Sequence, residues 1–301
     1  MRSLRIGKTT LQLKDYECSI DGSYLPKPDL RLWLYVNVTG GCNAACPFCI
    51  NPPKRLHQSI DVHTFSATLE QIESHVSGIS ITGGEPMLDV ALLEDTIAAI
   101  EGIVSPSVQL DLVTNGMNLT RLPHLRGLSR LTTIHVSRHA TSDEVNRRLM
   151  GWQDAPSTSE LAKAFDCLPD PGATVLNCVL QKGGVHDLAS AMEYLEMAAS
   201  IGASNVSFIG MIRANPYCAR NHVSPATLGF ESGEKVSIWN HFHDHDFCQC
   251  STGDYRARDG YIRFYYRYPG TSTPPSYCRQ LVYGADNVLR QGFGNSPEIK
   301  L

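Results

Sequence analysis

Three cysteines near the start of the chain have a spacing that suits iron–sulfur chemistry. Cys42, Cys46 and Cys49 follow the pattern C-x3-C-x2-C, and Phe48 stands directly before the last of them. Cysteine thiolates are the usual ligands of a [4Fe–4S] cluster. Three thiolates on one short loop can hold three irons and leave the fourth open to bind and reduce another molecule. Zinc sites also use closely spaced cysteines, so the spacing alone keeps both metals in consideration.

A glycine-rich stretch follows about one strand–helix unit downstream. Its residues are Gly83, Gly84, Glu85 and Pro86, and the short apolar run 79–82 precedes it. Glycines let the backbone approach a ligand closely, and a strand end presents carbonyl and carboxylate acceptors to an ammonium group. By itself, the stretch would equally suit an ordinary turn before a helix that begins near Asp89.

Taken together, the two motifs resemble those of radical S-adenosylmethionine (SAM) enzymes, including the aromatic residue before the last cysteine. The resemblance implies a [4Fe–4S] cluster on the three cysteines, with SAM on the fourth iron and its amino group at the glycine-rich turn. The reduced cluster would give SAM one electron, and the resulting 5′-deoxyadenosyl radical would take a hydrogen atom from the substrate. An electron donor such as flavodoxin or ferredoxin is then an expected partner.

The resemblance also implies further SAM contacts at the ends of later strands. They are Asn115 in a Thr-Asn-Gly turn, Ser137 and Arg138 for the carboxylate and ribose, Asn177 for the ribose, and Met211 for the adenine. Each position has an ordinary alternative. Asn115 suits a plain Asn-Gly turn, Arg138 suits a surface ion pair with Asp143 or Glu144, Asn177 suits a satisfied core amide, and Met211 suits core packing.

Six apolar runs alternate with helical patterns and predict parallel strands joined by right-handed crossovers. The runs cover 32–38, 78–82, 108–114, 132–137, 174–180 and 205–209. Six strands are too few for an eight-stranded barrel, so we predict an α/β fold, a partial TIM barrel of (β/α)6 type. Sites in such barrels form at the C-terminal strand ends, which would bring the cysteines and the glycine-rich turn to one mouth.

Helix boundaries can also be predicted from capping signals. Asp89 is a candidate N-cap, and Ser157 with Glu160 has capping-box spacing. A helical pattern over 188–199 should end at Gly202.

Four more cysteines, Cys218, Cys248, Cys250 and Cys278, lie in the C-terminal part of the chain. Radical SAM proteins often carry an auxiliary cluster there, so the resemblance favours a second [4Fe–4S] cluster on these thiols. The C-x-C-x27-C spacing departs from that of the GTP cyclase of molybdenum-cofactor synthesis. A zinc site with nearby histidines and unligated thiols are the alternatives.

An arginine-rich strand pattern follows Cys250. Arg263 and Arg267 would share one face of a strand over 261–268, with Ile262, Phe264 and Tyr266 on the other. Because arginine offers a preformed fork for phosphate or carboxylate, we predict that this pair binds an anionic group of the substrate at the mouth. A solvated edge strand is the alternative.

Composition limits the class of protein. The chain has 301 residues, 42% of them hydrophobic, and a net charge of −4, which gives no support to nucleic-acid binding. It has no apolar run long enough for a membrane helix and no secretory signal, so a cytoplasmic location with reduced thiols is expected. We predict an N-terminal extension at 1–30, the radical SAM core at 31–215, and a smaller C-terminal cap at 216–301.

The resulting functional prediction is a radical SAM enzyme that acts on a small molecule by rearrangement, cyclisation or oxidation. A peptide-modifying enzyme is the alternative within the class; it ranks second because 1–30 is short for a peptide-recognition domain. A non-catalytic iron–sulfur or zinc protein is the alternative outside the class.

Overall fold

The computed structural model describes most of the chain. The described residues are 2–13, 16–18, 24–26, 31–50, 58–213, 215–223, 228–244, 248–258, 260–268, 277–294 and 296–301, with the backbone alone described at 16–18, 24–26, 171, 239–244, 248–251 and 267–268.

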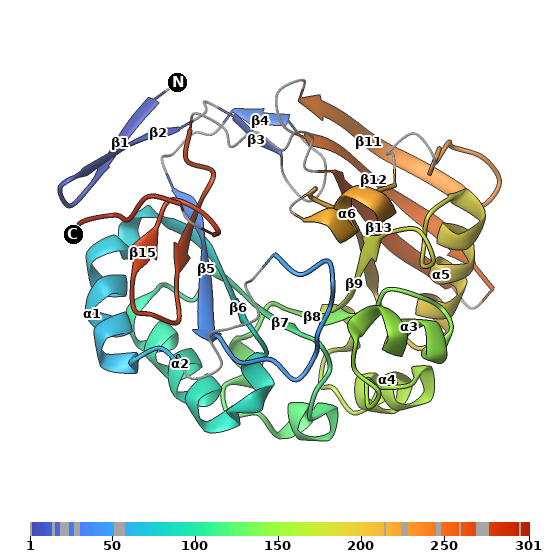
Figure 1. The fold of residues 1–301 in the computed structure, drawn as a ribbon, viewed down its shortest axis with the longest axis horizontal. Coiled ribbons are helices and arrows are strands. Elements are labelled where there is room, and N and C mark those ends of the chain that lie inside the picture. Colours follow the sequence, from blue (N-terminus) through green and yellow to red (C-terminus); the bar gives the residue numbers. More distant parts are fainter. Residues whose placement is uncertain are drawn as a thin grey trace.

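The centre of the fold is a curved sheet whose six middle strands are parallel (Figure 1). These strands are β5 (Leu32–Thr39), β6 (Val76–Gly83), β7 (Gln109–Thr114), β8 (Thr133–Ser137), β9 (Thr174–Leu180) and β10 (Asn205–Gly210). Each corresponds to one predicted strand, so the partial-barrel prediction is confirmed. The described strands do not close into a ring, because the 11-stranded sheet ends at β11 on one side and at β15 on the other.

Helices α1 (Val62–Ile72), α2 (Val90–Ile103), α4 (Thr158–Asp166) and α5 (Leu188–Ser200) pack against the sheet and bury side chains in the main hydrophobic core. The other two are α3 (Asp143–Met150) and α6 (Pro216–Asn221), whose buried Leu149 and Cys218 belong to a smaller apolar cluster with Phe48. The described 3₁₀ helices are η1 (Glu73–His75), η2 (Pro86–Leu88), η3 (Leu119–His124), η4 (Leu128–Arg130) and η5 (Pro171–Ala173). The predicted Asp89 cap and the Ser157–Glu160 capping box are both present, and Gly202 follows α5 with a φ of +78°.

Alternation along β5 explains which face each strand buries. Leu34 and Val36 are fully buried in the main hydrophobic core, whereas the alternate residues Tyr35 and Asn37 are only partly buried. Because successive side chains point to opposite faces of a strand, apolar residues pack under the helices and more polar ones line the inner face.

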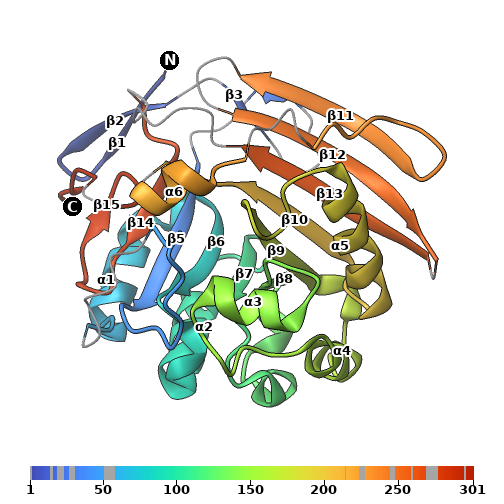
Figure 2. The same cartoon turned by 45° about the vertical axis from the view of Figure 1, so that its right-hand side comes forward.

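The terminal segments add hairpins and extend the sheet (Figure 2). Strands β1 (Arg2–Ile6) and β2 (Thr9–Leu13) pair, as do β3 (Tyr16–Cys18) and β4 (Tyr24–Pro26). The remaining strands are β11 (Val236–Asp244), β12 (Cys248–Ala257), β13 (Gly260–Tyr268), β14 (Gln280–Tyr283) and β15 (Leu289–Arg290). Strand β13 lies parallel to β10, and β14 lies parallel to β5, so residues after 216 continue the core sheet at both of its sides. In the described part of the chain, no helix has the length and apolarity needed to cross a bilayer.

Candidate active site

The three cysteine thiols lie close together on the loop after β5. Burial is the main cause that raises the pKa of Cys46 to about 12, and Cys49 and Cys42 raise it further. Burial also raises the pKa of Cys42, against a hydrogen bond from the Ala44 N–H. Thiols that oppose each other's ionisation fit a positively charged metal group, because ligation removes their protons and balances their charge.

The C-terminal end of α3 holds this loop in place. The Met150 carbonyl accepts hydrogen bonds from the Ala45 N–H at 2.9 Å and from the Cys46 Sγ at 3.5 Å. Gly151 has a φ of +58°, and a Cβ there would lie 2.8 Å from the Ala45 carbonyl oxygen. The loop and the helix end can therefore approach this closely only with glycine at 151.

The glycine-rich turn after β6 packs against the chain just before Cys42. Its Gly84 N–H donates to the Thr39 carbonyl at 2.7 Å, and the next N–H, of Glu85, donates to the Gly41 carbonyl at 2.8 Å. A Cβ on Gly84 would lie 1.8 Å from the Gly41 oxygen, and Gly83 has a φ of +134°. The two predicted motifs thus meet at one mouth, and both glycines are needed for the contact.

Glu85 joins the ends of β6 and β7. Its carboxylate is fully buried and accepts hydrogen bonds from the Thr114 hydroxyl at 2.6 Å and from the N–H groups of Asn115 at 2.6 Å and Met87 at 2.9 Å. Burial raises the pKa of Glu85 to about 7 in spite of these donors. The chain itself engages the carboxylate, and Pro86 behind it is buried at the start of η2.

Asn115 links the turn after β7 to the cysteine loop. Its Nδ2 donates to the Asn43 Oδ1 at 2.8 Å and lies 3.7 Å from the Cys42 Sγ. Among the described residues, the buried Asn43 Nδ2 and the buried Asn37 Oδ1 have no hydrogen-bond partner. Such atoms are costly unless something satisfies them, so this mouth fits a polar cofactor.

Phe48 and Met211 pack into one small apolar cluster behind the loop. The Phe48 ring lies edge-on to the His139 ring with 4.8 Å between centroids. His139 was not assigned a role from the sequence, although it follows Arg138 directly. Its Nδ1 accepts from the Val179 N–H at 3.1 Å, so the ring proton is on Nε2 and can be donated.

His139 predicts an acid-sensitive loss of stability. Burial, and then the charge of Arg138, lowers the pKa of His139 to about 3. Above about pH 6.5 the ring is neutral in both the folded and the unfolded protein. Below that pH only the unfolded chain takes up the proton, so the free energy of unfolding falls by up to about 1.4 kcal/mol per pH unit. We expect His139→Gln, which keeps an acceptor, to show a shallower loss in urea denaturation between about pH 7.5 and about pH 5. Equal slopes in both proteins would contradict this account.

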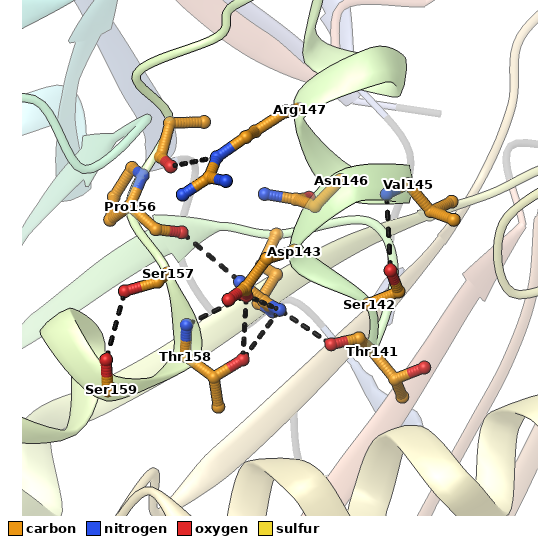
Figure 3. A network of polar contacts seen from close by, with 12 residues as sticks. Thr141, Ser142, Asp143, Val145, Asn146, Arg147, Pro156, Ser157, Thr158 and Ser159 are labelled. Atoms are coloured by element: carbon orange, nitrogen blue, oxygen red, sulfur yellow. Dashed lines mark hydrogen bonds and ion pairs between the residues drawn. The ribbon is translucent and has the colours of Figure 1, made fainter.

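The guanidinium of Arg138 is buried. Its partners Thr141, Asp143 and Thr158 belong to a polar network at the starts of α3 and α4 (Figure 3). The Arg138 Nη2 donates to the Asp143 Oδ1 at 2.7 Å, the Thr141 carbonyl at 2.7 Å and the Thr158 Oγ1 at 2.8 Å. Burial would raise the pKa of Asp143, but hydrogen bonds from Arg138 and Thr158 outweigh it and lower the pKa. Arg138 therefore pairs with Asp143, the ion pair that was predicted as the alternative to a SAM contact. The guanidinium of this pair is buried and does not lie at the surface.

A chain of polar contacts crosses the inner face of three strands. The Thr133 hydroxyl donates to the Asp111 Oδ1 at 2.6 Å and lies 3.0 Å from the His135 Nε2. The His135 Nδ1 lies 3.1 Å from the Asn177 Oδ1. Asn177, the predicted ribose contact, therefore has a hydrogen-bond partner within the protein. Ser137, the other predicted contact, is partly buried at the end of β8.

The four cysteines of the predicted second cluster are spread over different elements of the fold. The Cys218 Sγ is buried 4.0 Å from the Phe48 carbonyl oxygen, beside the first loop. Cys278 lies beside Gln280, which pairs with Trp33 at the amino end of β5. Cys250 is in register with Arg267, which pairs with Ile209 at the carboxyl end of β10. The side chains of Cys248 and Cys250 lie outside the described residues.

Arg263 and Arg267, the predicted anion-binding pair, lie beside different ends of β10. Arg263 pairs with Asn205 at the amino end of β10, away from the mouth, and its Nε lies 3.7 Å from the Asp254 Oδ1. The side chain of Arg267 lies outside the described residues. Ile262, Phe264 and Tyr266 are buried, as predicted for the opposite face.

Comparison with known proteins supports the assignment that this geometry suggests. The family model described as Radical SAM superfamily matches residues 36–195. The chain is 25% identical over 211 residues to a PqqA peptide cyclase from Ruegeria pomeroyi, covering 67% of this chain and 54% of that protein. A radical SAM methyltransferase from Sphaerobacter thermophilus is similar in structure, with a TM-score of 0.52, 15% identity, and coverage of 76% of this chain and 72% of that one. Streptococcus suis SuiB bound to S-adenosylmethionine matches with a TM-score of 0.49, 17% identity, and coverage of 63% and 43%.

The family model covers more than half of the chain, so the protein belongs to the radical SAM superfamily. It is therefore an enzyme of this class, and SAM and a [4Fe–4S] cluster are the cofactors of the family. The methyltransferase likeness supports the fold. The chain spans about half the length of the curated relative it matches (54%).

Proposed function

We propose that this chain binds SAM and one [4Fe–4S] cluster at the mouth and uses them to take a hydrogen atom from a peptide. The observation that carries the proposal is the loop of three neighbouring thiols, locked to the glycine-rich turn by two backbone hydrogen bonds. When bound, the cluster and SAM supply a one-electron cleavage that produces a radical able to abstract hydrogen.

Different residues of the mouth would hold the cluster and SAM. Cys42, Cys46 and Cys49 would ligate three irons. The turn at Gly83 and Gly84 would lie against the amino group of SAM, as the family resemblance implies. Asn43, with its unpartnered Nδ2, would donate to a cofactor atom, while Glu85 and Arg138 act indirectly by fixing the turns and helices around the site.

A peptide is preferred here over the small molecule favoured by sequence alone. The similarity to a PqqA peptide cyclase supports this change. Residues 1–30 are short for a peptide-recognition domain, but their length does not bear on peptide binding elsewhere in the chain. The polar inner face with Asp111, His135 and Asn177 gives a peptide side chain polar groups to meet below the mouth.

Deuterium transfer would test the substrate class. Reduced protein with SAM is incubated with deuterated short peptides encoded beside its gene, or with a pool of deuterated small metabolites. We expect deuterium to appear in 5′-deoxyadenosine, and the peptide mass to change, with a peptide only. Transfer from a small molecule and none from any peptide would return the assignment to the small-molecule class.

A further inference from the structure

The surface around α6 is rich in exposed positive charge. Lys182, Arg213 and Arg220 are all exposed there. The Lys182 N–H donates to the carbonyl of Asn221, the last residue of α6. Burial is the largest cause that lowers the pKa of His222, and the charges of Arg213 and Lys182 lower it further. Both cations therefore lie near His222, at the end of α6.

This helix packs directly on the cysteine loop. The Asn215 side chain, which caps α6, donates from its Nδ2 to the Pro47 carbonyl at 3.0 Å. Cys218, on the buried side of the helix, lies 4.0 Å from the Phe48 carbonyl oxygen. The exposed Arg220 therefore lies on a helix that contacts the cysteine loop directly, and Figure 2 shows α6 at the open end of the sheet.

Two exposed apolar side chains accompany the charges. Ile50, directly after Cys49, is 43% exposed, and Ile212, directly after the buried Met211, is 40% exposed. Apolar groups with charged groups around them are the usual composition of a protein interface.

We propose that the α6 surface, formed by Ile50, Lys182, Ile212, Arg213 and Arg220, docks a small acidic protein that delivers single electrons to the cluster. The partner is oxidised by one electron and the cluster is reduced by one. Complementary charge speeds such encounters, and redox complexes of this kind are small and transient. The inference rests on the proposed function, because it requires a cluster on the adjacent loop.

Its test compares two reductants in SAM cleavage without substrate, using the complete reconstituted protein. The variants are Lys182→Glu and the double change Arg213→Glu with Arg220→Glu. With reduced flavodoxin at low ionic strength, 5′-deoxyadenosine formation should fall by about tenfold or more. With dithionite, which needs no docking, the rate should be unchanged. Added salt should slow 5′-deoxyadenosine formation by the wild type with flavodoxin, so the difference in rate between the wild type and the variants should become smaller.

The matched control is Lys163→Glu, the same chemical change at an exposed position in the second half of α4, which leads toward the amino end of β9. It should keep the flavodoxin rate. An equal loss in this control, or a full flavodoxin rate in the α6 variants, would overturn the proposal. Failure of dithionite to support cleavage in the wild type would instead reject the proposed function. Retained flavodoxin rates with weakened peptide processing would identify the surface as a substrate site and also overturn it.

Discussion

Replacement of Cys42, Cys46 and Cys49 by alanine should abolish the formation of 5′-deoxyadenosine from SAM in the reduced protein. The three thiols are mutually close, and no other described cysteine lies at the mouth in a comparable group. Without thiolates a cubane cannot be held, so iron should fall from about four atoms per chain to nearly none. Product is measured chromatographically under dithionite, and iron by a colorimetric assay on the same samples.

Two cysteine controls sharpen this result. Cys167→Ala changes an exposed thiol away from the loop and should leave both readings intact. Cys278→Ser should also keep the iron content, because this thiol lies near the carbonyl oxygens of Gln280 and Gln291 rather than near Cys218. Undiminished SAM cleavage in the triple variant would reject the site. About four irons remaining in it would mean that the C-terminal cysteines do hold a second cluster.

The core strands and helix ends were predictable because their causes are local. A short, mostly apolar run such as 174–180 has the length of a buried strand rather than of a helix, and β9 has those bounds. Ser157 and Glu160 satisfy each other across one helical turn, so their spacing is enough to place the start of α4. The meeting of Cys42 with Gly84 followed from the same local order, since both come directly after adjacent parallel strands.

The partners of polar side chains were not predictable, because they depend on register and on distant elements. Glu85 has the right type for an ammonium ligand, but nothing in the sequence predicted that its carboxylate also accepts hydrogen bonds from donors 29 and 30 residues away. The strand order likewise depends on long-range pairing, so the sequence did not predict that β14 and β12, with Cys278 and Cys250 beside or in them, would join the sheet on opposite sides of the six core strands. His139 gave no signal of its own, since a histidine after a strand is equally common in a core.

Loss of the charge on Asp143 should destabilise the protein and disturb the cluster loop together. Asp143→Asn would leave the fully buried guanidinium of Arg138 without its counter-charge. The expected cost is about 3 kcal/mol, the lower end of the range for broken buried pairs, because the Asp143 side chain is 35% exposed. Adding Arg138→Met should recover part of this cost by removing the stranded charge, which urea denaturation of both variants would measure.

The functional consequence follows from the geometry of α3. This helix begins at Asp143 and ends at Met150, whose carbonyl holds Ala45 and Cys46, so a shift at its start is carried to the cysteine loop. Arg138→Lys separates this positioning role from direct SAM binding. Lysine keeps the charge but loses the planar fork, so stability and the electron paramagnetic resonance signal of the reduced, SAM-bound cluster should change while the KM for SAM stays near the wild-type value. A large rise in the KM for SAM with unchanged stability would show instead that Arg138 contacts the SAM carboxylate.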